Sequence, residues 1–228
     1  MDSIFSDSLF FGGALTLLTC MLGALLARKF KWMNVMVFSI VTIILFLKIF
    51  RISYETYDAG AKYISYLLTP VTVVLAVPLY RQLTILKHHA KEILIGITAG
   101  VVSSMSSILG LALLFDLSHE EYITLLPKSI TMAIGMGISD EFGGMVTITI
   151  AVIMITGILG NVFGEHILKL FRVHEPIAKG VAMGTGAHAF GTIRALKMGE
   201  IEGAMSSLSV AVAGLITVAA ASIFANLH

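Results

Sequence analysis

The chain has 228 residues and a formal net charge of +1, and only 13% of its residues are charged, 15 Lys and Arg against 14 Asp and Glu. Soluble domains carry roughly 25% charged residues, so the composition indicates an integral membrane protein with several spans. It excludes a disordered chain and a nucleic-acid-binding protein. Because Cys20 is the only cysteine, a disulfide scaffold is excluded as well.

Apolar runs long enough to cross a bilayer follow one another along the chain. About 20 apolar residues span the hydrocarbon core, where the backbone must be helical because no water satisfies it. The sequence therefore predicts an all-α, polytopic membrane protein with about six to eight membrane segments. The six apolar runs are Leu9–Ala27, Met33–Ile49, Ile64–Tyr80, Ile93–Phe115, Met145–Phe163 and Ala204–Leu227.

One transmembrane domain over residues 1–228 is expected, with N-terminal spans at 9–27 and 33–50 and a core at 54–228. The acidic start lacks the basic region of a signal peptide, so we expect the first helix to be kept. Lys and Arg favour cytoplasmic loops. The basic loops Arg28–Lys31, Arg81–Glu92 and Glu165–Lys179 share that side only if the segment Leu125–Gly144 makes no net crossing.

The segment Tyr66–Gln82 contains two prolines, Pro70 and Pro78. Proline removes a backbone donor and clashes with the preceding helical turn. We expect an interrupted helix here, and a span that is merely kinked is the alternative.

The segment Leu125–Gly144 is too short and too polar for a plain span. It begins with Pro127 and Lys128 and has Gly135 and Gly137 in its middle. The other polar residues along it are Ser129, Thr131, Asp140 and Glu141. We expect a re-entrant or half-length helix, with an interfacial helix and turn as the alternative.

The segment Val181–Arg194 is interrupted by glycines around His188. Small residues let helices pack closely, but this does not account for the histidine. An ionisable residue at membrane depth is a functional candidate, so we place His188 in a substrate or proton site. A histidine held by neighbouring carbonyl groups is the alternative.

Two blocks of equal length, Met33–Phe115 and Met145–Leu227, each contain a span, a broken segment and a span. If they run in opposite senses, they form an inverted repeat, a common plan of transporters. This prediction rests on hydropathy alone.

Broken helices expose N-terminal N–H groups inside the membrane, and these suit a carboxylate or a phosphate. The expected substrate-binding residues are His188, Arg194, Thr185, Gly186, Thr192, Lys128, Ser129 and Thr131. The proton-coupling candidates are His188, Asp140 and Glu141; the two acids have no such role if they are solvated loop residues. The expected positions of broken-helix backbone are Pro70, Pro78, Gly135, Gly137, Gly184 and Gly191.

Motifs of enzymes are absent from the sequence. It has no Gly-x-Ser-x-Gly, His-Glu-x-x-His or Walker pattern. Gly164-Glu-His166 and His174-Glu175 lack metal-ligand spacing. We expect no enzymatic activity, no metal and no cofactor.

The chain resembles the LrgB/CidB family of antiholin-like and holin-like bacterial membrane proteins. The resemblance lies in Tyr66–Gln82, Leu125–Gly144, Glu200–Ser207 and above all the motif His174–Ala195, and it covers about Tyr54 to the C-terminus. The family usually has Ala-Ser-His or Ser-Gly-His where this chain has Gly186-Ala187-His188. One hydroxyl is thus missing beside the histidine.

The resemblance implies two functions, in the bacterial cytoplasmic membrane. One is control of murein hydrolase activity and autolysis, and the other is transport of small monocarboxylates such as pyruvate or glycolate. It also implies a small membrane partner of the LrgA/CidA type, and we expect an oligomer. Broken helices with His188, Lys128 and Arg194 favour a carrier of small carboxylates, with a holin-like or antiholin-like regulator as the alternative.

Overall fold

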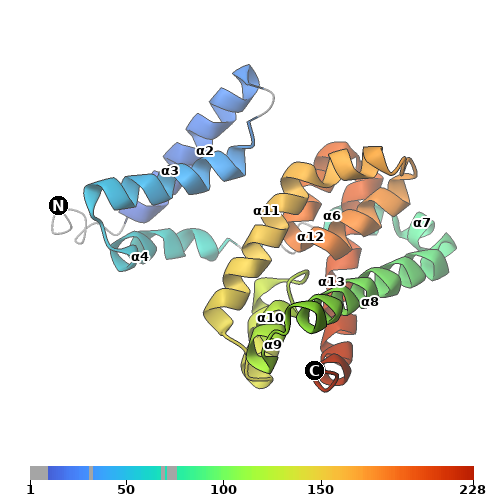
Figure 1. The fold of residues 1–228 in the computed structure, drawn as a ribbon. Coiled ribbons are helices and arrows are strands. Elements are labelled where there is room, and N and C mark those ends of the chain that lie inside the picture. The colour runs from blue at the N-terminus through green and yellow to red at the C-terminus, as the bar shows by residue number, and fades with distance from the viewer. Residues whose placement is uncertain (1–9, 31–32, 68–69, 71–75) are drawn as a thin grey trace. The chain divides into compact units, whose positions relative to one another are not determined.

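The computed structural model describes residues 10–30, 33–67, 70 and 76–228, and every regular element within them is a helix (Figure 1). The all-α fold class is therefore confirmed. The chain forms two compact units, Met1–Val74 and Leu75–His228. The prediction of one transmembrane domain and that of an inverted repeat, whose first block crosses the boundary between these units, stay predictions.

The N-terminal unit contains α2 (Phe11–Lys29), α3 (Val35–Phe50) and α4 (Tyr54–Ser65). Helix α2 packs against both α3 and α4. The Asn34 side chain caps α3 by accepting hydrogen bonds from two backbone N–H groups, and Ser53 caps α4. Helix α4 lies in the charged loop expected between two spans, so this loop contains a helix that hydropathy alone did not predict.

The larger unit contains eight helices in its described residues. Their bounds are α6 (Ala76–Arg81), α7 (Leu83–His88), α8 (Ala90–Phe115), α9 (His119–Leu125), α10 (Met132–Glu141), α11 (Val146–Leu170), α12 (Pro176–Met198) and α13 (Glu200–Ala225). The break predicted between Pro70 and Pro78 lies mostly outside the described residues.

Four described helices are long and apolar enough to cross a membrane, and they are α2, α8, α11 and α13. Each coincides with a run expected to be a span. Helix α3 is apolar but has only 16 residues, fewer than the about 20 that a bilayer core requires. These helices establish a multi-pass membrane protein.

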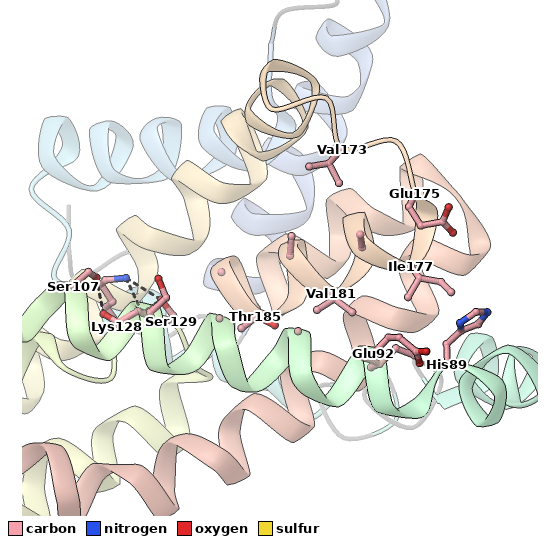
Figure 2. Close-up of a pocket in the computed structure, with 18 residues that line it drawn as sticks. His89, Glu92, Ser107, Lys128, Ser129, Val173, Glu175, Ile177, Val181 and Thr185 are labelled. Atoms are coloured by element: carbon pink, nitrogen blue, oxygen red, sulfur yellow. Dashed lines mark hydrogen bonds between the residues drawn. The ribbon is translucent and has the colours of Figure 1, made fainter.

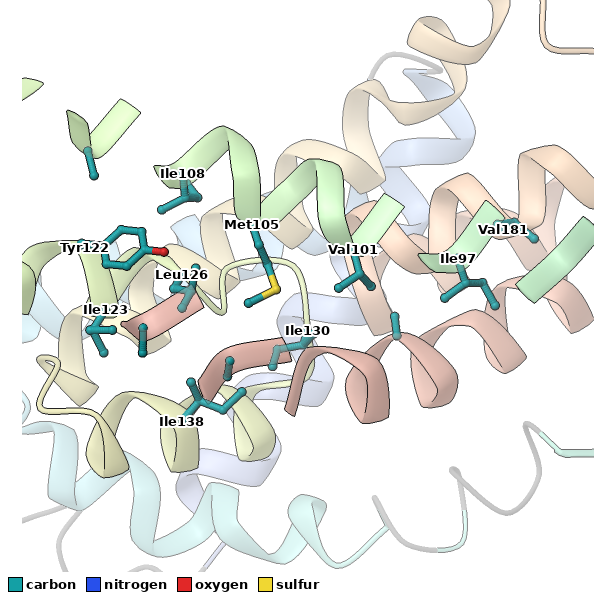
Figure 3. Packing of buried hydrophobic residues seen from close by; sticks show 14 of the residues in the cluster. Ile97, Val101, Met105, Ile108, Tyr122, Ile123, Leu126, Ile130, Ile138 and Val181 are labelled. Atoms are coloured by element: carbon teal, nitrogen blue, oxygen red, sulfur yellow. The ribbon is translucent and has the colours of Figure 1, made fainter. Parts of the chain in front are cut away.

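Helix α8 divides into an apolar face and a face of small residues. Its buried residues recur every three or four positions and pack against α9 and α13 (Figure 3). They are Ile93, Ile97, Val101, Met105, Ile108 and Ala112. A second face carries Gly96, Gly100 and Ser104, borders the site described below and approaches Thr185 of α12 closely at Gly100.

The segment Leu125–Gly144 forms the short helix that the sequence predicts. Helix α10 has ten residues, about 15 Å, which is half of the bilayer core of about 30 Å. Buried hydroxyls connect it to its neighbours, since Thr149 Oγ1 lies 2.8 Å from Ser139 Oγ and 2.9 Å from the Thr124 carbonyl. Thr124 Oγ1 in turn accepts a hydrogen bond from the Met145 backbone N–H.

Helix α12 breaks at the histidine. Ala187 (φ −134°, ψ 18°) and His188 (φ 40°, ψ −136°) leave the helical conformation. The two halves fold back on each other, because a Cβ atom at Gly191 would overlap the Met183 carbonyl, whereas these two positions lie about 12 Å apart in a straight helix. Each half is about 15 Å long, so α12 is a helical hairpin of half the bilayer depth.

Glycines allow the hairpin to contact α13 directly. A Cβ atom at Gly180 would lie 2.7 Å from Met205 Cβ, and one at Gly184 would lie 2.8 Å from Ser209 Cβ. Helix α13 offers small residues on this face, among them Ser206, which is completely buried. Small residues four positions apart are the usual means of close helix packing in membranes.

Candidate functional site

A groove of about 820 Å³ runs between α8 and α12 (Figure 2). Its walls are the small-residue face of α8 and the first half of the hairpin. Glycine and serine make up most of the α8 wall. The residues that the argument uses are Gly100, Ser104, Lys128, Ser129, Thr185 and Gly186.

Lys128 is the charged group at one end of this groove. It lies in the connection between α9 and α10, and its Nζ donates to Ser104 Oγ at 3.0 Å and to Ser129 Oγ at 3.1 Å. The two serine hydroxyls are themselves 3.0 Å apart. Within the described part of the chain Lys128 makes no ion pair. A half-buried ammonium group with neutral partners is electrostatically suited to an anion.

The opposite end of the groove carries carboxylates and a histidine instead of a lysine. His89 and Glu92 at the start of α8 and Glu175 at the start of α12 lie there (Figure 2). The groove is thus basic at Lys128 and acidic at Glu92 and Glu175. An anion is favoured only at the Lys128 end.

Thr185 lies on the hairpin side of the groove. Its side chain is 5% exposed, and its hydroxyl oxygen is buried with no hydrogen-bond partner among the described residues. A buried hydroxyl without a partner costs about 1–3 kcal/mol. Thr185 thus lines the groove with a hydroxyl whose hydrogen bonding is not satisfied by the described residues.

Four of the binding residues expected from the sequence line this groove in the structure, namely Lys128, Ser129, Thr185 and Gly186. Thr131 lies nearby in the chain as the residue before α10, and its side chain makes no capping hydrogen bond. Asp140 and Glu141, at the other end of α10, are exposed. These three residues do not line the groove.

His188 is buried behind the groove rather than in it. The residue is 2% exposed, its Nε2 lies 3.1 Å from the Ile153 carbonyl oxygen, and its ring makes a T-shaped contact with the Phe190 ring. A Cβ atom at Gly157 would lie only 2.8 Å from the imidazole. This is the geometry of a histidine held by a neighbouring carbonyl.

Thr192 fastens the second half of the hairpin. Its Oγ1 lies 2.9 Å from Ser206 Oγ on α13 and donates to the His188 carbonyl at 3.3 Å. Both hydroxyls are buried. Thr192 therefore has protein partners at its oxygen, and it lies outside the groove.

Arg194 is separated from Lys128. Its guanidinium forms an ion pair with Glu165 of α11, whose other oxygen lies 2.7 Å from Lys169 Nζ. Arg194 lines a second cavity, at the end of the hairpin where the two ends of α12 lie. The single anion site expected from Lys128, His188 and Arg194 is thus divided among a groove, a buried core position and a second cavity.

The expected broken-helix positions also have different environments. Gly184 and Gly191 lie at close contacts of the hairpin, and Gly135 lies against Ile153, whereas Gly137 faces open space. Pro78 is in the first turn of α6, a position proline tolerates. Pro70 is exposed.

Sequence reasoning missed the α8 wall of the groove. Hydropathy predicts a plain span over Ile93–Phe115, although Gly96, Gly100 and Ser104 recur every four positions within it. This spacing puts small residues on one helix face. The same spacing in the sequence could have predicted the α8 wall of the groove.

Together these features define a class of protein: a multi-pass helical membrane protein with a helical hairpin beside a groove that has a lysine at one end. The LrgB-like family matches residues 16–227. The chain is 35% identical over 218 residues to proteins called "Antiholin-like protein LrgB" of Bacillus cereus (strain B4264) and Bacillus anthracis (strain A0248), covering 94% of this chain and 95% of each relative. The chain belongs to the LrgB-like family. No solved structure matches it.

Proposed function

We propose that this protein is an antiholin-like regulator of murein hydrolase activity and autolysis in the bacterial cytoplasmic membrane. The observation that carries the proposal is its membership of the LrgB-like family over nearly its whole length, with relatives named for an antiholin-like role. In this proposal it acts with a small LrgA/CidA-type membrane protein. The LrgB-like family is not a known family of enzymes, in keeping with a regulatory role.

A lysis assay tests this role. The full chain is produced in a bacterium whose own relative is deleted, with and without the small partner, and detergent-induced lysis and murein hydrolase zymograms are recorded. We expect slower lysis and weaker hydrolase bands when the chain is present. Lysis curves that coincide with those of the empty strain, while the protein is detected in the membrane, contradict the role.

The groove favours a second function, the carriage of small monocarboxylates. The specific observation is Lys128, a half-buried cation whose partners Ser104 and Ser129 are neutral hydroxyls. A carboxylate beside Nζ supplies the missing negative charge through a charge-assisted hydrogen bond. Thr185 on the opposite wall, whose buried hydroxyl has no partner among the residues that the structure describes, is then a second polar contact.

Uptake by proteoliposomes tests the carrier. Labelled pyruvate and glycolate are supplied to vesicles containing the chain, with and without the partner. We expect Lys128→Met to lower uptake at least about tenfold, since a hydrogen bond to a charged group contributes about 1.5–3 kcal/mol. The matched control is Lys91→Met, an exposed lysine of α8 outside the groove. Leakage of a larger dye without saturable uptake identifies a pore instead.

A further inference from the structure

The second cavity of the larger unit has a charge composition that neither proposed function uses. It measures about 470 Å³ and is bounded by the end of α11, both ends of the hairpin and the start of α13. Four cations line it, Lys169, Lys179, Arg194 and Lys197, together with the carboxylates of Glu165 and Glu202. The lining thus holds a surplus of two positive charges when His174, its remaining titratable group, is neutral.

The acids of the cavity leave two lysines without a counter-ion. Glu165 is already occupied by both Arg194 and Lys169. Among the residues that the structure describes, Lys179 and Lys197 form no ion pair. Glu202, which also lines the cavity, is 8% exposed and forms no ion pair among the described residues. Two lysine ammonium groups therefore remain free to contact a ligand.

Arg194 adds an unused donor to this surplus. Its Nε is buried and has no hydrogen-bond partner in the described chain, although its terminal nitrogen is paired with Glu165. Buried donors are nearly always paired in folded proteins. A ligand in the cavity that reaches Nε would therefore satisfy a donor that the described residues leave unpaired.

The hairpin fold is what assembles these groups. Lys179 lies in the first turn of α12 and Lys197 in its last turn, positions that lie about 27 Å apart in a straight helix. The reversal at His188 brings them to one cavity. The cavity lies at the connection between α11 and α12, within the basic segment Glu165–Lys179 whose Lys and Arg content predicts the cytoplasmic side.

We propose that this cavity binds a phosphate group, as a phosphomonoester or phosphodiester, at the cytoplasmic face. A phosphomonoester carries close to the two negative charges that neutralise the surplus, and its oxygens accept from an arginine and from lysines at the same time. Basic pockets between membrane helices on the cytoplasmic side also accept anionic lipid headgroups. The chemistry is common to a soluble phosphate and a lipid headgroup.

Thermal unfolding of the purified full chain tests the proposal. The midpoint is measured in phosphatidylcholine nanodiscs with increasing inorganic phosphate, and separately in nanodiscs containing phosphatidylglycerol. We expect one of these two probes to raise the midpoint. A response to phosphate alone identifies a soluble ligand, a response to phosphatidylglycerol alone identifies a lipid, and either supports the site.

The variants are Lys179→Gln, Lys197→Gln and their combination, and the matched control is Lys87→Gln combined with Lys91→Gln, two exposed lysines of the same unit. We expect apparent affinity to fall at least about tenfold in the double variant and not in the control. The single variants serve if the double variant does not fold. Absence of a shift with both probes, or an equal shift in cavity variants and control, overturns the proposal. Lys128→Met, which alters the groove, is expected to keep the shift.

Discussion

The two interrupted segments of this chain, Leu125–Gly144 and the α12 hairpin, achieve half-bilayer depth by different means. The first ends in a short helix fixed by hydroxyls, with Thr149 bonded to both Thr124 and Ser139. The second reverses direction and adds close glycine contacts with α13 to its buried hydroxyl bond between Thr192 and Ser206. The difference teaches that buried hydroxyl bonds occur in both segments, whereas a chain reversal against a neighbouring helix also requires close packing.

The two segments also make different contributions to the groove. The connection before α10 supplies its charge, Lys128, and the hairpin supplies a wall of small residues with Thr185 among them. Neither segment forms the site alone. The stability of each segment is therefore separable from its role in binding, and substitutions that damage packing are distinguishable from those that remove charge.

Overpacking the hairpin is expected to have the largest effect on the free energy of unfolding. In Gly184→Leu the new side chain meets the Ser206 carbonyl and Ser209, so we expect a loss of about 3 kcal/mol or more in the free energy of unfolding. The thermal midpoint in detergent measures it. The control is Gly186→Leu, where a Cβ atom meets nothing within 4 Å. Equal midpoints for the two variants contradict close packing as the hairpin's support.

The reversal itself is tested at His188. His188→Ala removes the hydrogen bond to Ile153 and the contact with Phe190, and we expect a loss of about 2 kcal/mol. His188→Gly removes the same side chain, but glycine adopts the φ of 40° without steric cost. The glycine variant should therefore be about 1 kcal/mol more stable than the alanine variant. The opposite order rules out this backbone geometry.

Hydropathy was enough to predict the long helices, because α8, α11 and α13 are set by apolar runs that a bilayer forces into helix. The glycines of Val181–Arg194 predicted an interruption there, and the chain leaves the helical conformation at Ala187 and His188. Gly135 and Gly137, also expected at a break, lie within the continuous helix α10 instead. The sequence pattern did not predict that α12 turns back on itself. That outcome depends on contacts of Gly180 and Gly184 with α13, which are tertiary.

The sequence predicted which residue types line the candidate site, but it did not predict which of these residues lie together in the groove. Lys128 and Thr185 were expected together and share the groove. Arg194 was expected with them, but its partner Glu165 lies 29 positions earlier in the chain, and local sequence carries no signal of that pairing. His188 was expected to face a substrate, whereas its orientation is decided by the Ile153 carbonyl on another helix.

The hydroxyl network of the first segment is tested by Thr149→Val, which keeps the shape of the side chain. The loss of bonds to Ser139 and Thr124 in a fully buried position should lower the unfolding free energy by about 1–2 kcal/mol. Thr147→Val, an exposed position of the same helix, is the control. A midpoint unchanged in both variants implies that α10 is held by apolar packing instead.

The smallest effect is expected at Asp140 and Glu141, at the end of α10. Both are exposed, and an exposed carboxylate outside the groove has no means of sensing a substrate near Lys128. We expect Asp140→Asn combined with Glu141→Gln to change the unfolding free energy by no more than about 0.5 kcal/mol. The pH dependence of carboxylate uptake should be the same as for the unmodified protein. A displaced pH profile would instead assign proton coupling to Asp140 and Glu141. In that case the end of α10 would take part in transport along with Lys128, and the segment Leu125–Gly144 would contribute more to function than its charge at Lys128.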